Sequence, residues 1–404
     1  MEIRSITFFC NPGFPVNKLL LQKAGIFMRH ARAAYEKAGF VVQTVRLATP
    51  PFPLYLQPKN YLLGAQTIAF EAHGEGFDYF SIGPALAEFP SAYEAIPTIL
   101  SETKGLFVSG LTTTSAGQLS QPAIRACAEI MVKAALLEKD GFANLRFASL
   151  ANVPAYAPFF PAAYSAEAQP AFALSIEAAD LAVQAFSSAT TLANARAILI
   201  YEIESNARKL EAVADQLQSI YKYDFKGLDF TLAPFPKENL SIGTAIQKIG
   251  LPVVGYQGTL AASAFITDTL DQAKFKRCGF NGLMLPVLED YTLGQSAAQG
   301  TLAVSALLLF SAVCGTGLDV IPLPGDTSAE EIYPVLLDLS ALALRLNKPL
   351  TARLLPMPGK KAGDETNFDF EYFTNTRVML LNAKPLHGLL AGQELLTISP
   401  RQRE

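Results

Sequence analysis

Short β-branched or aromatic runs alternate with longer helical runs along almost the whole chain, and this alternation constrains the fold most strongly. It predicts a largely parallel β-sheet whose strands are joined by crossover helices, as in α/β proteins. No fixed-period repeat, low-complexity tract or Pro/Ser-rich linker separates two modules. We therefore predict one large α/β barrel domain over residues 1–404, with pseudo-halves at roughly 1–190 and 191–404.

The pattern locates the expected elements within a few residues. The predicted strands are 3–9, 41–47, 79–82, 105–109, 145–150, 171–175, 228–232, 252–255, 282–287, 319–323, 352–356 and 378–382. The predicted helices are 17–38, 122–139, 193–221, 295–313 and 329–346. The aromatic and Pro-rich stretch 153–164 is too apolar for a solvated linker, so we expect a packed loop over one mouth of the barrel.

The charge balance excludes one class of partner. The chain has 32 Lys plus Arg and 36 Asp plus Glu, a net charge of −4, and no run of like charges. A nucleic-acid surface needs clustered cations, so nucleic acid is not an expected partner. Charged residues make up 17% of the chain, against roughly 25% in globular proteins. A large buried area or a homo-oligomer interface would explain this low share.

The cysteines and the N-terminal residues indicate the compartment. Cys10, Cys127, Cys278 and Cys314 are far apart and lack Cys-x-x-Cys spacing. This spacing predicts neither a disulfide framework nor a zinc ribbon. The first residues have the pattern of a strand rather than that of a signal peptide. We therefore expect a cytoplasmic protein.

One apolar stretch raises the question of a membrane. No charge occurs between Asp290 and Asp319, and 302–313 is almost wholly apolar. A membrane-spanning helix needs about 20 predominantly apolar residues. This run is shorter and is followed at once by Gly-rich sequence, so we predict a buried helix and no membrane partner.

Five motifs of the second half occur in an order that resembles an uncharacterised family, the domain of unknown function family 711. They are Asp-Phe-Thr-Leu-Ala-Pro-Phe-Pro (229–236), Gly-Tyr-Gln-Gly-Thr-Leu-Ala-Ala (255–262), Leu-Pro-Val-Leu-Glu-Asp (285–290), Cys-Gly-Thr-Gly-Leu-Asp (314–319) and Arg-Leu-Leu-Pro-Met-Pro-Gly (353–359). The first half matches less closely. The resemblance implies a barrel of two half-sheets like that of the pyruvate formate-lyase type of glycyl radical enzymes, with a polar cleft inside.

Glycyl radical chemistry is not expected from this resemblance. Those enzymes carry a C-terminal glycine in an Arg-Val-x-Gly pattern, because a radical on a glycine α-carbon is stabilised without a side chain. The nearest match here is Arg-Val-Met-Leu (377–380), which lacks the glycine. The cofactor requirement is therefore left open.

Cys314 and Asp319 are the first two catalytic candidates, because the motif 314–319 places a thiol and a carboxylate around Gly-rich turns. Cys314 follows the predicted helix, whose negative dipole end disfavours a thiolate. Its alternative role is that of a small buried residue before Gly315. Asp319 opens a predicted strand, and its carboxylate faces either the cleft or neighbouring backbone amides.

Glu289 and Asp290 end another predicted strand. Adjacent side chains of an extended chain point to opposite faces, so one of the two is expected in the cleft, and we favour Glu289 as the third catalytic candidate. Asp290 is kept as a binding residue. A hard cation held by Glu289 and Asp319 is an alternative, but our prediction includes no metal site.

Two polar turns are candidates for anion binding through backbone amides and hydroxyls. Gly255, Gly258 and Thr259 belong to a Gly-Tyr-Gln-Gly-Thr turn that leads into a helix, without a known nucleotide-binding pattern. Thr114 and Ser115 lie in an uncharged polar run between a strand and a helix. Helix capping explains the same residues equally well.

These residues lead to two functional hypotheses. The first is an enzyme that acts on a small polar or anionic metabolite in an internal cleft, by acid–base or thiol-assisted chemistry with Cys314, Asp319 and Glu289. The second is a non-catalytic protein that binds or senses a small molecule in the same cleft.

Overall fold

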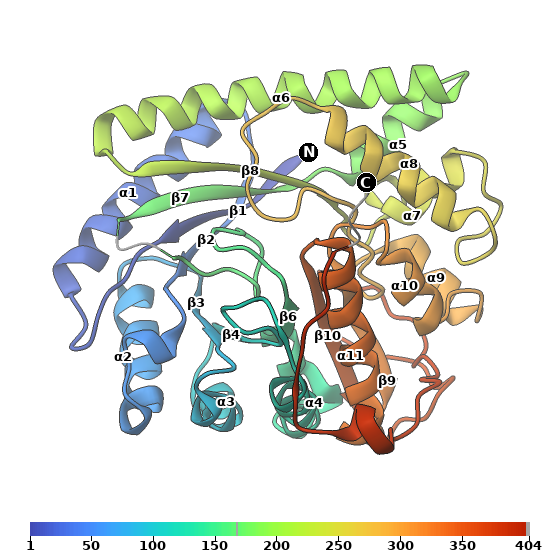
Figure 1. The fold of residues 1–404 in the computed structure, drawn as a ribbon. Coiled ribbons are helices and arrows are strands. Elements are labelled where there is room, and N and C mark those ends of the chain that lie inside the picture. The colour runs from blue at the N-terminus through green and yellow to red at the C-terminus, as the bar shows by residue number, and fades with distance from the viewer. Residues whose placement is uncertain (167–168, 401–404) are drawn as a thin grey trace.

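A mixed α/β architecture is seen in the computed structural model, which describes residues 1–166 and 169–400 (Figure 1). Nine strands form one continuous sheet in the order β8-β7-β1-β2-β3-β4-β6-β10-β9. These strands are β1 (Glu2–Phe9), β2 (Val42–Ala48), β3 (Tyr79–Ala85), β4 (Leu106–Leu111), β6 (Phe147–Ala151), β7 (Ala171–Glu177), β8 (Asp224–Ala233), β9 (Gly317–Pro324) and β10 (Leu350–Met357). A separate small sheet pairs β5 (Leu119–Ser120) with β11 (Leu395–Leu396).

Strand direction divides the large sheet into three groups. The strands β1, β2, β3, β4 and β6 run parallel to one another. At one flank β7 is antiparallel to β1 and parallel to β8, and at the other β10 is antiparallel to β6 and parallel to β9. Strands from both predicted pseudo-halves therefore share one sheet.

The described residues form eleven α-helices, most of which pack on one face of this sheet. They are α1 (Lys18–Lys37), α2 (Tyr61–Gly74), α3 (Pro90–Glu102), α4 (Gln121–Ala135), α5 (Ala179–Ser188), α6 (Leu192–Tyr221), α7 (Ile242–Lys248), α8 (Thr259–Gln272), α9 (Tyr291–Ala298), α10 (Val304–Phe310) and α11 (Ala329–Leu346). In Figure 1, α1 and α6 lie beside the β8-β7-β1 flank, and α2, α3 and α4 follow one another along β3, β4 and β6.

The helix starts follow from local sequence. Asn17, Ser120, Thr191, Ser241 and Ser328 precede α1, α4, α6, α7 and α11, and each side chain accepts a hydrogen bond from a backbone N–H of the first turn. Such N-caps satisfy amide groups that have no partner within the helix.

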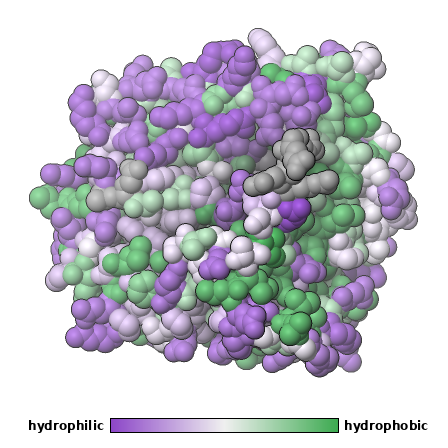
Figure 2. Space-filling view, in the orientation of Figure 1, coloured by the Kyte–Doolittle hydropathy of each residue, from purple (hydrophilic) through white to green (hydrophobic). Residues whose placement is uncertain are grey.

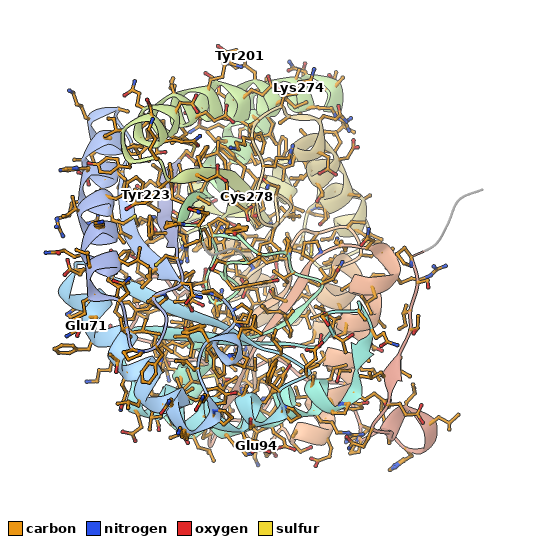
Figure 3. The ribbon with its side chains drawn as sticks, turned by 60° about the vertical axis from the view of Figure 1, so that its left-hand side comes forward. Glu71, Glu94, Tyr201, Tyr223, Lys274 and Cys278 are labelled. Carbon is orange, nitrogen blue, oxygen red and sulfur yellow. The ribbon has the colours of Figure 1, made fainter. Side chains whose placement is uncertain are left out.

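The long helix α6 shows how the buried and exposed faces are separated. Its buried residues include Leu199, Ile203 and Leu210, which repeat at helical spacing and face the core. The outer surface over α6, along the top of the molecule, is largely hydrophilic (Figure 2). Tyr201 projects from this face, whereas Cys278 lies inside the outline of the molecule (Figure 3).

A closed barrel is not found among the described residues, so the fold agrees with the prediction only as a mixed α/β sheet. The edges are β8 and β9. One segment, 276–288, contacts both of them through isolated bridges, from Arg277 to Leu228 and from Pro286 to Asp319. At the β8 edge the Asp229 carboxylate also accepts from the backbone nitrogen of Phe280, at 2.8 Å.

Two glycines let this segment cross the chain that leads into β9. A Cβ placed on Gly282 would lie 2.1 Å from the Cα of Gly315, and one on Gly315 would lie 2.2 Å from the Cα of Gly282. The Leu283 carbonyl accepts from Gly315 N at 2.9 Å. Gly315, the second residue of the motif 314–319, is therefore required by close backbone contact.

Three predicted strands are wrong. Residues 252–255 form a turn, and 282–287 and 378–382 lack strand structure apart from the bridge at Pro286. The segment 153–164 is a packed loop, as predicted. Its carbonyls at Pro158 and Ala163 accept from Thr7 Oγ1 at 2.9 Å and Ser81 Oγ at 2.8 Å, on the face of the sheet opposite the helices.

The predicted helix 295–313 is interrupted. Helix α9 ends at Ala298, and Gly300 adopts a positive φ of 74°, the left-handed conformation that commonly ends helices. The second helix, α10, buries Val304, Leu307 and Phe310. Leu309 is 57% exposed, so one face of the predicted buried helix is buried and the other reaches the surface. No helix in the described part of the chain combines the length and apolarity needed to span a membrane.

We predict that Gly315→Ala lowers the free energy of unfolding by about 1–3 kcal/mol or more, because both crossing segments are fixed backbone and cannot move aside cheaply. The matched control is Gly74→Ala, where an added Cβ meets nothing within 4 Å and helix propensity improves. Denaturant unfolding curves of both variants measure the effect. A Gly315→Ala curve that coincides with the wild type would contradict the packing argument.

Candidate functional site

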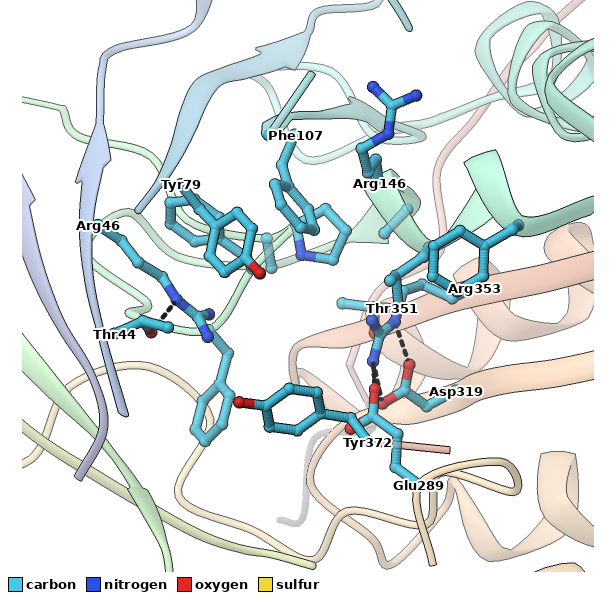
Figure 4. Close-up of a pocket in the computed structure, with 18 of the residues that line it drawn as sticks. Thr44, Arg46, Tyr79, Phe107, Arg146, Glu289, Asp319, Thr351, Arg353 and Tyr372 are labelled. Atoms are coloured by element: carbon cyan, nitrogen blue, oxygen red, sulfur yellow. Dashed lines mark hydrogen bonds and ion pairs between the residues drawn. The ribbon is translucent and has the colours of Figure 1, made fainter. Parts of the chain in front are cut away.

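One pocket lies on the face of the sheet opposite the helices, with a volume of about 550 Å³. Its wall includes residues of β1, β2, β3, β4, β6, β9 and β10, together with the packed loop at Phe159–Ala162 and a later loop at Phe370 and Tyr372. Its size lies within the roughly 300–1,000 Å³ typical of small-molecule sites. Figure 4 shows this pocket in close-up.

The two-residue period of the strands determines which side chains enter the pocket. In β2, Val45 and Leu47 belong to the main hydrophobic core, whereas Thr44 and Arg46 line the pocket. In β4, Leu106 and Val108 belong to the core, whereas Phe107 lines the pocket. Alternate residues of a strand face opposite sides of a sheet, so one face is packed and the other presents polar and aromatic groups.

A line of alternating charges crosses one side of the pocket. Arg4 Nη1 contacts Glu177 Oε2 at 3.0 Å, and Arg4 Nη2 contacts Glu289 Oε2 at 2.9 Å. Arg353 Nη2 contacts Glu289 Oε1 at 3.1 Å and Asp319 Oδ2 at 2.9 Å. The sequence Glu177, Arg4, Glu289, Arg353, Asp319 is called the charge ladder below.

The charge ladder implies strong curvature of the sheet. Arg4 lies on β1 and Arg353 on β10, and β2, β3, β4 and β6 separate these two strands in the sheet. Both guanidinium groups nevertheless contact the one carboxylate of Glu289. The inner face must therefore be concave, with Glu289 joining its two sides.

Burial and ion pairing shift the side-chain pKa values of the charge ladder in opposite directions. Burial disfavours the charge on Arg353, but Asp319 and Glu289 outweigh that effect and raise the pKa of Arg353. The same balance, with Glu289 and Glu177 as the anions, raises the pKa of Arg4. For Asp319, burial outweighs the Arg353 cation and raises the carboxyl pKa. Paired cations thus stay charged, whereas Asp319 binds a proton more readily than an ordinary aspartate.

Arg46 differs from the other arginines of the pocket. Arg146 contacts Glu138 at 2.7 Å, and Arg4 and Arg353 belong to the ladder. Within the described residues, no carboxylate lies within ion-pair distance of Arg46. Its Nε donates to Thr44 Oγ1 at 2.9 Å, and its guanidinium carbon lies 5.1 Å from the ring centroid of Phe160.

The environment of Arg46 disfavours its charge. Burial, and then the nearby Arg4 cation, lower the pKa of Arg46 to about 9. A partly desolvated cation without a counter-ion is unfavourable unless an anion binds to it. In Figure 4 its guanidinium is directed toward the open space, across from Arg353 and Asp319. Arg46 is thus the part of the wall best suited to hold an anion.

The predicted catalytic residues are only partly brought together. Glu289 and Asp319 line the same pocket and share Arg353. Cys314 is fully buried in the main hydrophobic core and is not part of the pocket wall. Its carbonyl accepts a hydrogen bond from Lys348 Nζ, together with the carbonyls of Ser311 and Ala312 at the end of α10.

The Asp290 carboxylate forms hydrogen bonds at the starts of two helices and does not line the pocket. Its Oδ1 accepts from Leu293 N at 2.9 Å and from Ser241 Oγ at 2.7 Å, and its Oδ2 accepts from Ile242 N at 2.6 Å. The side chain is fully buried. These contacts cap α9 and anchor the start of α7, and they account for its carboxylate without a ligand.

The predicted anion turns lie outside the pocket wall. Gly255 N donates to Thr259 Oγ1 at 3.0 Å, and Gly258, with φ 102°, is the N-cap of α8. Ser115 donates to Glu88 from its backbone nitrogen at 2.9 Å and from its hydroxyl at 2.8 Å, and Thr114 Oγ1 accepts from Gln118 N. Local turn and capping contacts therefore occupy these groups.

Sequence reasoning missed Arg4, Arg46, Arg353 and Glu177. Each is a charged residue in a strand made largely of apolar and β-branched residues. A charge at such a position is rare unless it is paired or functional. This rarity is the feature of the sequence that could have identified the four residues. No group of three or more His, Cys, Asp or Glu side chains in 1–166 and 169–400 is arranged to hold a metal. The two carboxylates of the alternative cation site, Glu289 and Asp319, both contact Arg353.

We predict that Glu289→Ala lowers the free energy of unfolding by about 3–5 kcal/mol, because it leaves two buried guanidinium groups without their shared anion. The control is Glu36→Ala, an exposed glutamate near the end of α1, which should change stability by less than about 0.5 kcal/mol. Equilibrium unfolding measures both. Equal effects of the two substitutions would show that the ladder does not hold the pocket together.

Comparison with known proteins agrees with the motif resemblance. The model of the family described as "Uncharacterised ACR (DUF711)" matches residues 1–374. The chain is 30% identical over 360 residues to a UPF0210 protein of Pyrobaculum islandicum, covering 83% of this chain and 79% of that protein. It is 29% identical over 353 residues to a UPF0210 protein of Acetivibrio thermocellus, covering 82% and 77%. A UPF0210 protein of Oenococcus oeni is 25% identical over 371 residues, with coverage of 87% and 82%. The chain therefore belongs to the DUF711 family.

Proposed function

We propose that this protein binds a small organic anion in the pocket on the inner face of the sheet, with the anionic group on Arg46. The observation that carries the proposal is the lack of a carboxylate partner for the Arg46 guanidinium in the described wall. Every other arginine of that wall is paired with an acidic side chain. An anion at Arg46 would gain charge-assisted hydrogen bonds in a partly desolvated place, where they are strongest.

The surroundings of Arg46 support a ligand rather than a structural role. The Thr44 hydroxyl accepts from Arg46 Nε and donates to the Arg4 carbonyl, and the Tyr79 and Phe160 rings lie 5.8 and 5.1 Å from the Arg46 guanidinium carbon. A guanidinium that lies over aromatic rings keeps its in-plane N–H groups available for an anion. These groups can bind a carboxylate or phosphate oxygen pair.

Acid–base catalysis on the bound anion is the second candidate function. The raised pKa of Asp319 favours it, because proton transfer near neutral pH needs a carboxyl group of higher pKa than usual. Glu289 would then hold Arg353 in position. Loss of hydrogen–deuterium exchange into a bound anion in Asp319→Asn, with its affinity unchanged, would support this role. A thiol-assisted reaction is not supported, because Cys314 is buried in the apolar core.

A second part of the proposal concerns the fold and its relation to the barrel of the pyruvate formate-lyase type. We infer that the curved sheet is a variant of such a barrel, in which the segment 276–288 fills the gap between β8 and β9. The bridges of Arg277 to Leu228 and of Pro286 to Asp319 support this inference.

The proposal predicts that Arg46→Met weakens the binding of simple anions at least about tenfold, because each charge-assisted hydrogen bond contributes about 1.5–3 kcal/mol. Calorimetric titration with acetate, benzoate and inorganic phosphate measures the dissociation constants. The control is Arg208→Met, an exposed arginine on α6. Equal anion affinity of wild type and Arg46→Met would contradict the proposal.

The pH dependence gives a second readout of the same site. The pKa of Arg46 is lowered to about 9, and only its protonated form attracts an anion. We therefore expect affinity to be constant at neutral pH and to fall as the pH rises through that value toward the ordinary arginine range, about tenfold per pH unit. Because anion binding itself stabilises the charged form, the occupancy measured at saturating ligand falls only at higher pH than the affinity does. An affinity that is unchanged up to pH values well above 9 would assign the binding to another cation.

A further inference from the structure

The pocket has two aromatic walls, and their composition bears on the chemistry of its ligand. The first wall is made by Tyr79 of β3, Phe107 of β4 and Phe160 of the packed loop. The Tyr79 and Phe107 rings are 5.5 Å apart between centroids at 80°, and Phe107 and Phe160 are 5.3 Å apart at 62°. These edge-to-face contacts fix the rings against one another. Arg46 lies over Tyr79 and Phe160, so this wall adjoins the anion position.

The second wall comes from a different part of the chain. Phe370 and Tyr372 lie in the loop between Thr366 and Thr376, and the Phe142 ring packs on Phe370 at 5.2 Å and 78°. Tyr372 packs on Phe370 at 5.3 Å and faces the Arg4 guanidinium at 5.6 Å. In Figure 4, Tyr79 and Phe107 lie on one side of the open space and Tyr372 on the opposite side.

The loop that carries the second wall is held at its base. The Asn375 side chain donates from Nδ2 to the Phe368 carbonyl at 3.1 Å and accepts at Oδ1 from the Phe368 backbone nitrogen at 2.8 Å. Thr366 Oγ1 accepts from the backbone nitrogen of Thr376 at 2.8 Å. The rings of Phe370 and Tyr372 are therefore presented by a fixed loop. The pocket therefore has aromatic side chains on two opposite sides.

The charges of the wall limit the ligand to few negative groups. The ladder arginines and Arg146 are occupied by carboxylates, and Lys104 is exposed at the rim. Arg46 is then the one inward guanidinium of the described wall that remains for an anion. A polyphosphate would leave charges without partners, which is unfavourable in such a place. A monoanion needs one guanidinium partner, and Arg46 provides it.

The pocket volume sets a lower limit on the size of a ligand that would fill the pocket. A two- or three-carbon acid occupies a small part of about 550 Å³ and leaves most of the aromatic surface in contact with water. Burial of apolar surface contributes about 25 cal/mol per Å², so a ligand that covers both walls gains much more. Flat rings gain further from offset or edge-to-face contacts with aromatic side chains.

We propose that the ligand of this pocket is an aromatic monocarboxylate, with its carboxylate on Arg46 and its ring between the Tyr79 wall and the Tyr372 wall. This inference rests on the proposed function, since it assigns the chemical class of the anion bound at Arg46. It narrows the small polar or anionic metabolite expected from the sequence to one class of anion. The observations that carry it are the two aromatic walls, the single unpaired guanidinium and the volume between them.

The absence of Trp from the chain allows a direct test. The full-length protein is titrated with indole-3-acetate, whose fluorescence is excited where tyrosine does not absorb. Acetate and inorganic phosphate are measured by competition, and indole without a carboxylate is the uncharged comparison. We expect indole-3-acetate to bind at least about tenfold more tightly than acetate, phosphate or indole, as burial of a ring implies.

The variants Tyr372→Ala and Phe107→Leu test the two walls, with Tyr201→Ala as the control because that ring is 64% exposed on α6. Each wall variant should weaken indole-3-acetate about fivefold or more and leave acetate and phosphate unchanged. Acetate or phosphate binding as tightly as indole-3-acetate, or indole-3-acetate binding that neither wall variant weakens, would overturn the assignment while the proposed function stood. Binding of no anion, or equal binding of indole and indole-3-acetate, would overturn both.

Discussion

Glu289 is shared by Arg4 and Arg353, and the arrangement of the pocket depends on this one carboxylate. It lies before α9, outside the nine-stranded sheet, yet it contacts guanidinium groups of β1 and β10. Those strands are separated by four others, so the contact requires the sheet to curve around the site. Buried ion pairs of this kind add little net stability compared with apolar packing, but removal of one partner is costly. Their main effect is to fix where the strands lie.

The ladder also explains why Arg46 remains without a carboxylate. The three acidic groups Glu177, Glu289 and Asp319 are committed to Arg4 and Arg353. Arg46 receives only the Thr44 hydroxyl and two aromatic faces. Cation–π contacts contribute about 0.5–2 kcal/mol, which is less than the penalty for a poorly solvated charge. We therefore propose that the energy of this position improves when an anion binds, as expected of a binding site that is formed in advance.

The sequence alone predicts much of the sheet and part of the site. The strands near 3–9, 41–47, 171–175 and 319–323 were located correctly, because β-branched and aromatic runs mark them. Helices α2, α3, α5 and α7 were missed. In α2 apolar residues face outward as well as inward, with Phe70 77% exposed, and α3 contains Pro97, which usually ends a helix.

The candidate site was harder to predict for a physical reason. Glu289 and Asp319 were selected correctly as residues that share one cavity, but their partners were not, because Arg4 and Glu289 are 285 positions apart. Such a contact depends on the curvature of the sheet, which no local pattern encodes. The motif around Cys314 was selected for its thiol, whereas its glycines explain the motif: Gly315 crosses Gly282, and Gly317 lies against the backbone of Thr351.

The most direct test of the account is the stability of Arg46→Met without ligand. In a chloride buffer free of organic anions and phosphate, the variant removes an uncompensated cation and keeps an apolar side chain of similar length. We predict that its free energy of unfolding at neutral pH exceeds that of the wild type by about 1–3 kcal/mol. A variant that is less stable than the wild type would show that Arg46 is already satisfied within the protein, and that the pocket does not reserve it for an anion.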